Sequence, residues 1–128
     1  MSNPPLFFYG DEARKVIAYV KGKYGDELEF LWPKSPSTAI LRRKDTSKWY
    51  AALLNLPQSK LGLASRADVD IINLRAEPSE VAALVDGERY FPGWHMNKRH
   101  WITLCLDGTV PVEEICERVD ISYHLAKK

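Results

Sequence analysis

The stretch "AILRRKDTSKWYAALLNL", residues 39–56, decides the fold class of this chain. Apolar residues dominate both of its ends, and the polar run Lys44-Asp45-Thr46-Ser47-Lys48 separates them. Two β-type runs around a short polar segment are typical of a β-hairpin. Because a hairpin pairs its strands in antiparallel fashion, we expect a sheet built from antiparallel neighbours.

Helix and strand patterns extend in both directions from the predicted hairpin. Before it, residues 11–24 place apolar side chains at helical spacing, and Gly25 is positioned to end that helix. The hairpin is followed by a polar loop over 57–68, a strand over 69–76 and a short helix from Pro78 to Gly87. An irregular aromatic segment over 88–97 then leads to a strand over 100–106 and to a helix that begins at Pro111. This order predicts an α+β sandwich in which helices pack on one face of an antiparallel sheet.

The run "HWITLCL", residues 100–106, is the clearest strand in the second half of the chain. Because side chains alternate across a strand, its two faces carry Trp101, Thr103 and Cys105 on one side and Ile102, Leu104 and Leu106 on the other. One face holds a tryptophan and the other is wholly aliphatic, so we expect both faces to be largely covered. Trp101 is accordingly predicted to lie in the core, and Cys105 and Cys116 are predicted to be buried reduced thiols.

Length and composition predict one domain over residues 11–128, preceded by a Pro- and aromatic-containing arm over residues 1–10. The chain has 18 Lys and Arg against 17 Asp and Glu, which excludes a strongly basic coat but not a local basic patch. No apolar run approaches the roughly 20 residues of a membrane span, and the start does not resemble a signal peptide. We therefore expect a cytoplasmic monomer with no membrane association.

Two basic groups are the candidate functional residues. The first lies on the predicted hairpin and its tip and comprises Arg42, Arg43, Lys44 and Lys48. The second precedes the strand at 100–106 and comprises Trp94, His95, Asn97, Lys98, Arg99 and His100. Basic side chains are the usual donors to backbone phosphates, a protruding hairpin can enter a groove, and an exposed tryptophan can stack on a base. Together the two groups form the predicted DNA-contacting site.

Each group also has a purely structural interpretation. Basic side chains on an exposed hairpin prevent edge-to-edge pairing with another chain. Lys98 and Arg99 can simply form the solvated entrance of a strand, and His95 and His100 can hold the backbone around the bend at Pro92-Gly93. The sequence leaves these alternatives open, because it does not show whether the two groups converge on one face of the molecule.

The sequence offers little support for a metal centre, a cofactor or catalysis. His95 and His100 have no cysteine or third histidine at ligand spacing, whereas structural zinc normally takes four protein ligands. Cys105 lies in the middle of an apolar strand, where burial would raise the pKa of its thiol. No glycine-rich phosphate loop and no G-x-S-x-G or H-E-x-x-H motif occurs. We expect no metal, no cofactor and no enzymatic activity.

The segment "YFPGWHMNKRHWITLCLDGTVPVEEICERVDISYHLA", residues 90–126, resembles the C-terminal signature of the MmcQ/YjbR family. That signature is roughly H-x-N-K-x-H-W, an apolar strand, D-G-[ST]-x-P and a helix ending in D-x-S-Y. The matching positions are His95, Asn97, Lys98, His100, Trp101, Asp107, Gly108, Pro111, Asp120, Ser122 and Tyr123. The resemblance implies a CyaY-like (frataxin-like) sandwich and DNA binding. It departs at the first hairpin, where many relatives have a Gly-rich turn and this chain has "KDTSK".

Two functional hypotheses follow from these features. The first is a DNA-binding module whose basic hairpin and strand-entry residues contact phosphates with little reading of bases. The second is a protein-interaction or small-ligand-binding module without catalytic activity, suggested by the near-neutral charge and the aromatic residues from Tyr90 to Trp94. A continuous basic face would favour the first hypothesis, and an exposed aromatic cleft would favour the second.

Overall fold

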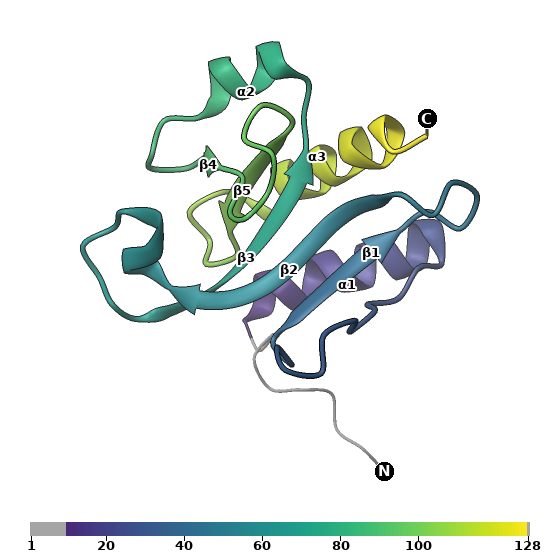
Figure 1. Cartoon of the computed structure of the whole chain (residues 1–128), viewed down its shortest axis with the longest axis horizontal. Helices are drawn as coiled ribbons and strands as arrows, with labels where there is room; N and C mark the ends of the chain where they lie inside the picture. The colour runs from purple at the N-terminus through teal and green to yellow at the C-terminus, as the bar shows by residue number, and fades with distance from the viewer. Residues whose placement is uncertain (1–9, 128) are drawn as a thin grey trace.

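The predicted hairpin forms one edge of a five-stranded antiparallel sheet in the computed structural model, which describes residues 10–127 (Figure 1). The strands are β1 (Thr38–Arg42), β2 (Trp49–Pro57), β3 (Asp68–Arg75), β4 (Phe91–Pro92) and β5 (Trp101–Cys105). Their order across the sheet is β1-β2-β3-β5-β4, and every neighbouring pair is antiparallel. The predicted sheet is thus confirmed, whereas residues 1–9 of the predicted arm lie outside the described residues.

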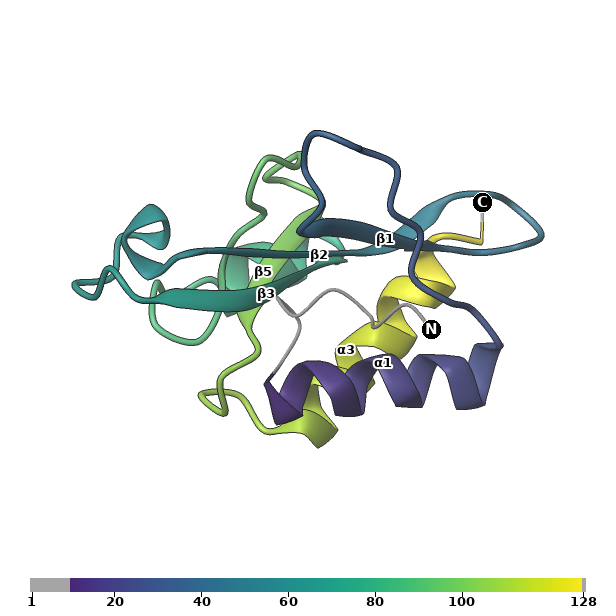
Figure 2. The same cartoon turned by 90° about the horizontal axis from the view of Figure 1, so that it is seen from below.

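Two long helices, α1 (Asp11–Tyr24) and α3 (Val112–Leu125), lie against each other on one face of the sheet, as Figure 2 shows. α1 ends at Gly25, whose φ of 70° lies in the left-handed region that favours glycine. Asp11 and Glu12 occupy the first turn of α1, where carboxylates interact favourably with the helix dipole. The predicted α+β sandwich with helices on one face is confirmed for these two helices.

Two short elements differ from the predictions. Helix α2 (Pro78–Leu84) follows β3 and ends before Gly87, because Val85 already has an extended backbone. Asp86 organises the next turn by accepting hydrogen bonds from the N–H groups of residues 88–90, which lower the pKa of its carboxyl to about 2. The predicted loop over 57–68 also contains one turn of 3-10 helix, η1 (Gln58–Leu61).

The main core lies between the sheet and the helices α1 and α3. Its fully buried side chains come from both helices and from the central strands, and they include Ala13, Val16, Val20, Leu53, Ile72, Leu74, Ile102, Leu104, Ile115 and Val119. Burial of an aliphatic side chain of this size contributes about 1.5–3 kcal/mol to stability. This layer accounts for the helical faces and strand faces that the sequence pattern predicted.

A second, smaller cluster covers part of the opposite face, which we call the open face because α1 and α3 do not cover it. The cluster contains Leu56, Val69, Ile71, Phe91 and Cys105, with Leu61, Leu63 and Trp94 packed against it. Trp101 lies on the same side of β5 and is only 6% exposed. The prediction that both faces of β5 are covered, with Trp101 in the core, is confirmed.

A bulge at Tyr50 decides which aromatic side chains of β2 reach the open face. Leu41 of β1 is opposite Ala51, but the next residue, Arg42, is opposite Trp49, so Tyr50 has no direct partner in the pairing. Tyr50 therefore turns into the main core, where its hydroxyl donates a 2.7 Å hydrogen bond to Asp26. As a result, the Trp49 side chain lies on the open face, where it lines a depression.

Candidate nucleic-acid interface

Arg43, predicted as a phosphate contact, instead holds the hairpin to α3. Arg43 is 8% exposed, and two of its guanidinium nitrogens donate hydrogen bonds to the Asp45 carboxylate at 2.7 and 2.8 Å. A third nitrogen donates to the carbonyl of Tyr123 at 2.9 Å, and the guanidinium lies 4.1 Å from the centre of the Tyr123 ring. Hydrogen bonding from Arg43 lowers the pKa of Asp45 to about 2. Arg43 is thus turned inward and does not belong to a contact surface.

The other hairpin cations differ in the number of hydrogen bonds and ion pairs that they form within the chain. Arg42 forms a bidentate pair with Glu29, with nitrogen–oxygen distances of 2.9–3.1 Å. Lys44 donates to the carbonyl of Gly25 at 2.9 Å and lies 3.5 Å from Asp26, although its side chain is 71% exposed. Lys48 is exposed, and its ammonium has no ion pair within residues 10–127. Of the predicted hairpin contacts, Lys48 is the most available to a ligand.

The strand-entry segment is exposed and shaped by its own hydrogen bonds. The Asn97 side chain accepts a 2.9 Å bond from the N–H of Arg99, and the His100 N–H donates to the Asn97 carbonyl. Lys98 donates to the carbonyl of Gly93 at 3.0 Å. These bonds form a turn that leaves the guanidinium of Arg99 in solvent, with no ion pair to any residue in the described range.

The two predicted basic groups lie at the same end of the sheet but not side by side. The strand register places Arg42 opposite Trp49, Ala51 opposite Leu74, and Leu74 opposite Ile102. The hairpin tip and the segment before β5 therefore extend from the same end, separated by three strand spacings or about 14 Å. A single extended ligand can reach both groups, whereas one phosphate cannot.

The open face contains an aromatic depression of about 320 Å³ beside these groups. Its aromatic lining consists of Trp32, Trp49 and Trp94, joined by His95 and Met96, and we call it the tryptophan groove. Trp32 meets Trp49 edge to face, with ring centres 5.6 Å apart. The His95 ring stacks on Trp94, with centres 4.6 Å apart and planes 13° from parallel. Aromatic ring faces are the main feature that the groove offers to a ligand.

Buried polar side chains hold the Trp94 end of the groove in place. Asn73 is 1% exposed, and its amide donates to the Trp94 carbonyl at 3.0 Å. Thr103 accepts a 2.8 Å bond from the Trp94 N–H and donates its hydroxyl proton to Asn73. Gly93 is required here because a β-carbon at its position would lie 2.6 Å from that of Trp101. Asn73 escaped the sequence analysis, although a lone amide within the apolar run "VDIINLRA" is a detectable signal.

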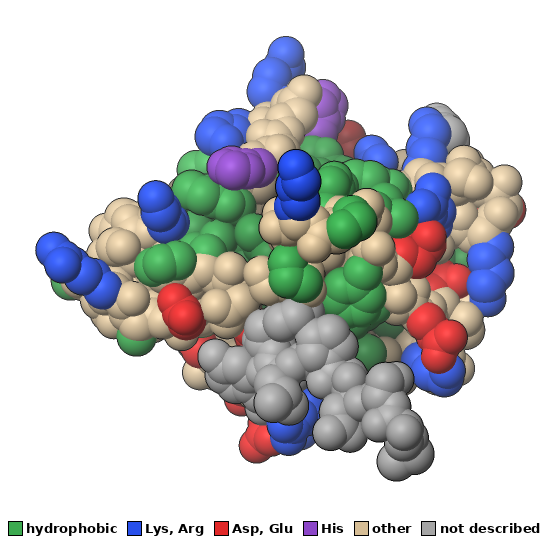
Figure 3. Space-filling view, turned by 60° about the horizontal axis from the view of Figure 1, so that its bottom comes forward, with side chains coloured by type: hydrophobic (Ala, Val, Ile, Leu, Met, Phe, Trp, Pro, Cys, Tyr) green, Lys and Arg blue, Asp and Glu red, His purple; other side chains and the backbone are tan. Residues whose placement is uncertain are grey.

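Five exposed cations on the loops that border the open face form no ion pair with any residue in the described range. The three loops that border the open face, residues 30–37, 58–67 and 93–100, contain no Asp or Glu. Their exposed cations, which we call the basic rim, are Lys34, Lys60, Arg66, Lys98 and Arg99. Figure 3 shows hydrophobic side chains in the middle of the visible surface, Lys and Arg along its upper and left margins, and Lys and Arg mixed with Asp and Glu on its right side. The near-zero net charge thus conceals a local positive field around an apolar centre.

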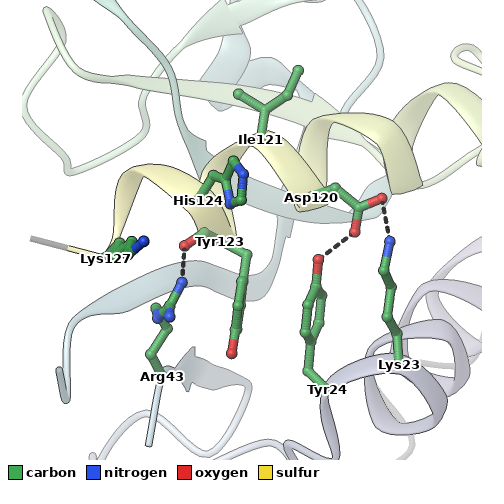
Figure 4. A pocket seen from close by; sticks show the side chains of 8 residues that line it. All are labelled: Lys23, Tyr24, Arg43, Asp120, Ile121, Tyr123, His124 and Lys127. Atoms are coloured by element: carbon green, nitrogen blue, oxygen red, sulfur yellow. Dashed lines mark hydrogen bonds and ion pairs between the residues drawn. The ribbon is translucent and has the colours of Figure 1, made fainter. Parts of the chain in front are cut away.

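A second depression lies at the hairpin tip between α1 and α3, and we call it the tyrosine pocket (Figure 4). It has a volume of about 480 Å³, and Tyr24 stacks on Tyr123 there with ring centres 3.7 Å apart. Asp120 accepts hydrogen bonds from Tyr19 at 2.6 Å, Tyr24 at 2.5 Å and Lys23 at 3.0 Å. Burial acts to raise the pKa of Asp120, but these hydrogen bonds outweigh it and the pKa is lowered.

The pocket's polar groups tie secondary-structure elements together. Asp120 joins α3 to α1, and the adjacent Ser122 accepts from the N–H of Arg75 at 2.8 Å and donates to the carbonyl of Tyr50. The D-x-S-Y segment therefore docks α3 to both α1 and the sheet. Because Lys23, Arg43 and Asp120 already face partners within the chain, the tyrosine pocket has less to offer a ligand than the tryptophan groove.

Neither cysteine has the environment of a reactive thiol. Cys105 and Cys116 are both buried and unpaired, as predicted. Burial, with a smaller contribution from Asp107, raises the pKa of Cys105 to about 12, and burial also raises the pKa of Cys116. Within residues 10–127, no cluster of three or more His, Cys, Asp or Glu side chains could hold a metal ion. In the same range, no helix has the length and apolar character needed to cross a membrane.

The fold and the two depressions define a small α+β domain with an aromatic, cation-rimmed open face. The family model described as YjbR matches residues 21–125, and the chain belongs to the YjbR family. It is 39% identical over 112 residues to a Bacillus subtilis (strain 168) protein named "Uncharacterized protein YyaQ", with 88% of this chain and 95% of that protein covered.

Solved structures have the same arrangement. A crystal structure of a Pseudomonas syringae protein is 35% identical and superposes with a TM-score of 0.85, covering 89% of this chain and 97% of that one. A crystal structure of a Deinococcus radiodurans protein with a DUF419 domain is 25% identical, with a TM-score of 0.66 and coverages of 92% and 78%. The architecture described above is therefore shared by experimentally determined relatives.

Proposed function

We propose that this domain binds DNA through the phosphate backbone, using cations around the open face. The charge of the loops carries the proposal: the loops bordering this face have Lys and Arg but no carboxylate, whereas α1 and α3 together hold six carboxylates and five Lys or Arg side chains and are close to neutral. A nucleic acid would be attracted to the positive loops more strongly than to the nearly neutral helices.

The contact residues differ from those first predicted. Lys48, Lys98 and Arg99 remain at the centre of the proposal because they are exposed at one end of the sheet. Lys60 and Arg66 join them from the polar loop over 57–68, and Lys34 joins them from a loop that the sequence did not connect to the site. Arg43 is not among the proposed contacts, because it is bonded to the carbonyl of Tyr123. Arg42 would contact a phosphate only after breaking its ion pair with Glu29.

Salt-dependent binding of a labelled DNA duplex tests this function. Phosphate contacts release counterions, so the binding constant should fall steeply with salt, with a logarithmic slope of roughly −0.9 per phosphate neutralised. The variant Lys48→Ala/Arg99→Ala should weaken binding and reduce the magnitude of that slope by about 1 to 2. The matched variant Arg14→Ala/Lys15→Ala removes the same charge from α1 and should have little effect. Absence of salt-sensitive binding at low salt would falsify the proposal.

A protein-interaction or small-ligand module is the second candidate. The observation in its favour is the run Phe30-Leu31-Trp32, whose members are 43%, 40% and 37% exposed. Consecutive exposed hydrophobic side chains are characteristic of interaction sites. Binding to an apolar partner would depend weakly on salt, so the same titration separates the two candidates.

We also propose that the sandwich is of the CyaY-like (frataxin-like) type. What supports this is the pairing of the first and last long helices, α1 and α3, on one face of an antiparallel sheet. A frataxin-like fold raises the question of iron binding. We do not propose an iron site for this chain, because the first turn of α1 has only Asp11 and Glu12 and no extended acidic ridge.

A further inference from the structure

We infer that the tryptophan groove stacks an unpaired nucleobase, so that the domain binds single-stranded nucleic acid in preference to duplex. This inference rests on the proposed nucleic-acid function and assigns the groove a separate role within it. The basic rim would hold the phosphates, and the three tryptophans would hold one or more bases. The ligand chemistry is an aromatic ring on a polyanionic backbone.

The size and lining of the groove fit a flat aromatic ring. Its volume of about 320 Å³ is at the low end of the roughly 300–1,000 Å³ found for small-molecule sites. The lining combines tryptophan faces with a few neutral polar groups, among them Ser35 and Thr38, and includes no carboxylate. A base and the phosphates attached to it can therefore approach the groove without electrostatic repulsion from a carboxylate in its lining.

The groove is also prepared for stacking before a ligand arrives. Asn73 and Thr103 fix the backbone on both sides of Trp94, so little conformational freedom is lost when a ring stacks there. At the opposite wall, Trp32 leans edge to face on Trp49 and remains 37% exposed. His95 has a φ of 57°, an uncommon left-handed backbone for a residue other than glycine, and this conformation accompanies its stacking on Trp94.

Charge complementarity identifies the occupant among the partners that an aromatic groove could take. Lys34 lies between the lining residues Trp32 and Ser35, and Lys98 and Arg99 follow the lining residue Met96 by two and three positions. A stacked base attached to a phosphodiester backbone satisfies both the aromatic centre and the basic rim. Bases in a duplex are already stacked on one another, whereas unpaired bases can turn outward onto aromatic side chains.

Fluorescence anisotropy with four ligands of matched charge tests the inference: oligothymidine of about 12 nucleotides, oligouridine of equal length, an abasic strand of equal length, and a duplex. The thymidine and uridine strands should bind more tightly than the abasic strand and the duplex, and they should quench tryptophan fluorescence. Because the first two strands differ in the 2′-hydroxyl and in the methyl group of the base, their comparison shows whether these two groups together affect binding.

The informative variant is Trp32→Ala, because this ring is exposed and its loss should leave the domain folded. It should weaken binding of the single strands by roughly 5- to 100-fold and leave the abasic strand and the duplex unchanged, while Trp32→Phe should retain most of the affinity. Leu31→Ala is the matched control, since Leu31 is equally exposed but does not line the groove.

Three other outcomes would overturn the inference. Equal binding of abasic and base-carrying strands refutes base stacking but leaves phosphate binding intact. If Trp32→Ala binds single strands as tightly as the wild type, the base lies elsewhere. The groove then serves another partner, such as a protein segment. Failure of every nucleic acid to bind removes the proposed function and the inference together.

Discussion

The tryptophan groove and the tyrosine pocket both have aromatic linings, but the charged side chains in or near them have different environments. In the tyrosine pocket, Arg43 meets Asp45 and a carbonyl, and Asp120 meets two tyrosines and Lys23. Around the tryptophan groove, the basic rim has no carboxylate within its own loops. Satisfied charges stabilise the fold, whereas cations left in solvent are available to a ligand.

The same comparison holds for the aromatic rings. Tyr24 and Tyr123 stack on each other at 3.7 Å and bridge α1 and α3. Trp32 and Trp94 lie on separate walls of their groove, and each contacts a different neighbour, Trp49 and His95 respectively. The Tyr24–Tyr123 stack closes the space between its two rings, whereas Trp32 and Trp94 contact different neighbours and both line the groove, so the space between them stays open to a ligand. This difference makes the tryptophan groove the stronger candidate for binding.

Loss of Asn73 should have the largest effect on stability. We expect Asn73→Ala to lower the free energy of unfolding by about 3 kcal/mol, because it leaves the Trp94 carbonyl and the Thr103 hydroxyl without their buried partner. Urea denaturation measures the change. Asn55→Ala is the control: this residue is less buried and makes one side-chain bond to Asp70, so about 1 kcal/mol is expected. An Asn73 effect no larger than the control would show that the groove is not held by this network.

Removal of Arg43 should destabilise the hairpin tip without affecting ligand binding. We expect Arg43→Ala to cost about 2 kcal/mol in unfolding free energy, because the link from the tip to the Tyr123 carbonyl is lost and Asp45 becomes unpaired. Lys44→Ala, at the exposed neighbouring position, should change stability by less than about 0.5 kcal/mol. A salt titration with DNA should give the wild-type slope for Arg43→Ala, and a reduced slope would contradict its structural assignment.

Protonation of Asp120 should weaken the tyrosine pocket in acid. The pKa of this carboxyl is lower in the folded chain, so its contribution is fully present above the unfolded value of about 3.9 and is lost as the pH falls through the folded value. Asp120→Asn should cost about 1 kcal/mol at neutral pH and make stability fall less steeply below pH 4. Parallel acid-unfolding curves for the variant and the wild type would indicate that another group dominates.

Truncation of Trp32 should have the smallest effect on folding. The ring is 37% exposed and its recorded ring contact is the edge-to-face pair with Trp49, so we expect Trp32→Ala to lower the unfolding free energy by less than about 1 kcal/mol. Thermal unfolding provides the measurement. A larger loss would place Trp32 among the residues that build the fold and would weaken the contrast between the two regions.

Much of the fold was predictable because it is encoded in local patterns. The alternation in residues 100–106 correctly assigned Trp101 and Leu104 to opposite covered faces, and Gly25 marked the end of α1. α2 was predicted too long, because Gly87 suggests a helix end while Asp86 had already organised the turn before it. Local periodicity identifies an element but does not locate its ends when side-chain hydrogen bonds compete.

The site was less predictable, because its residues come from segments far apart in the chain. His95, Lys98 and Arg99 are exposed and Trp94 is half-buried, and these four predicted contacts lie together before β5 because they are close in the sequence. Trp32 and Lys34 were not among the predicted contacts, since nothing local shows that their loop folds over β2. Arg42 and Arg43 look equivalent in the sequence, yet one is paired with Glu29 and the other is inserted against Tyr123.

The sequence by itself determined the family, the antiparallel hairpin and the faces of the helices and of β5, since each depends on neighbouring residues or on a contiguous signature. Only the tertiary structure decided which cations remain in solvent and which aromatic rings share a groove. The bulge at Tyr50 turns Trp49 to the open face, and Arg43 finds its carbonyl partner 80 residues away in the chain. Charge and exposure at a surface depend on such long-range contacts, so only the folded chain reveals them.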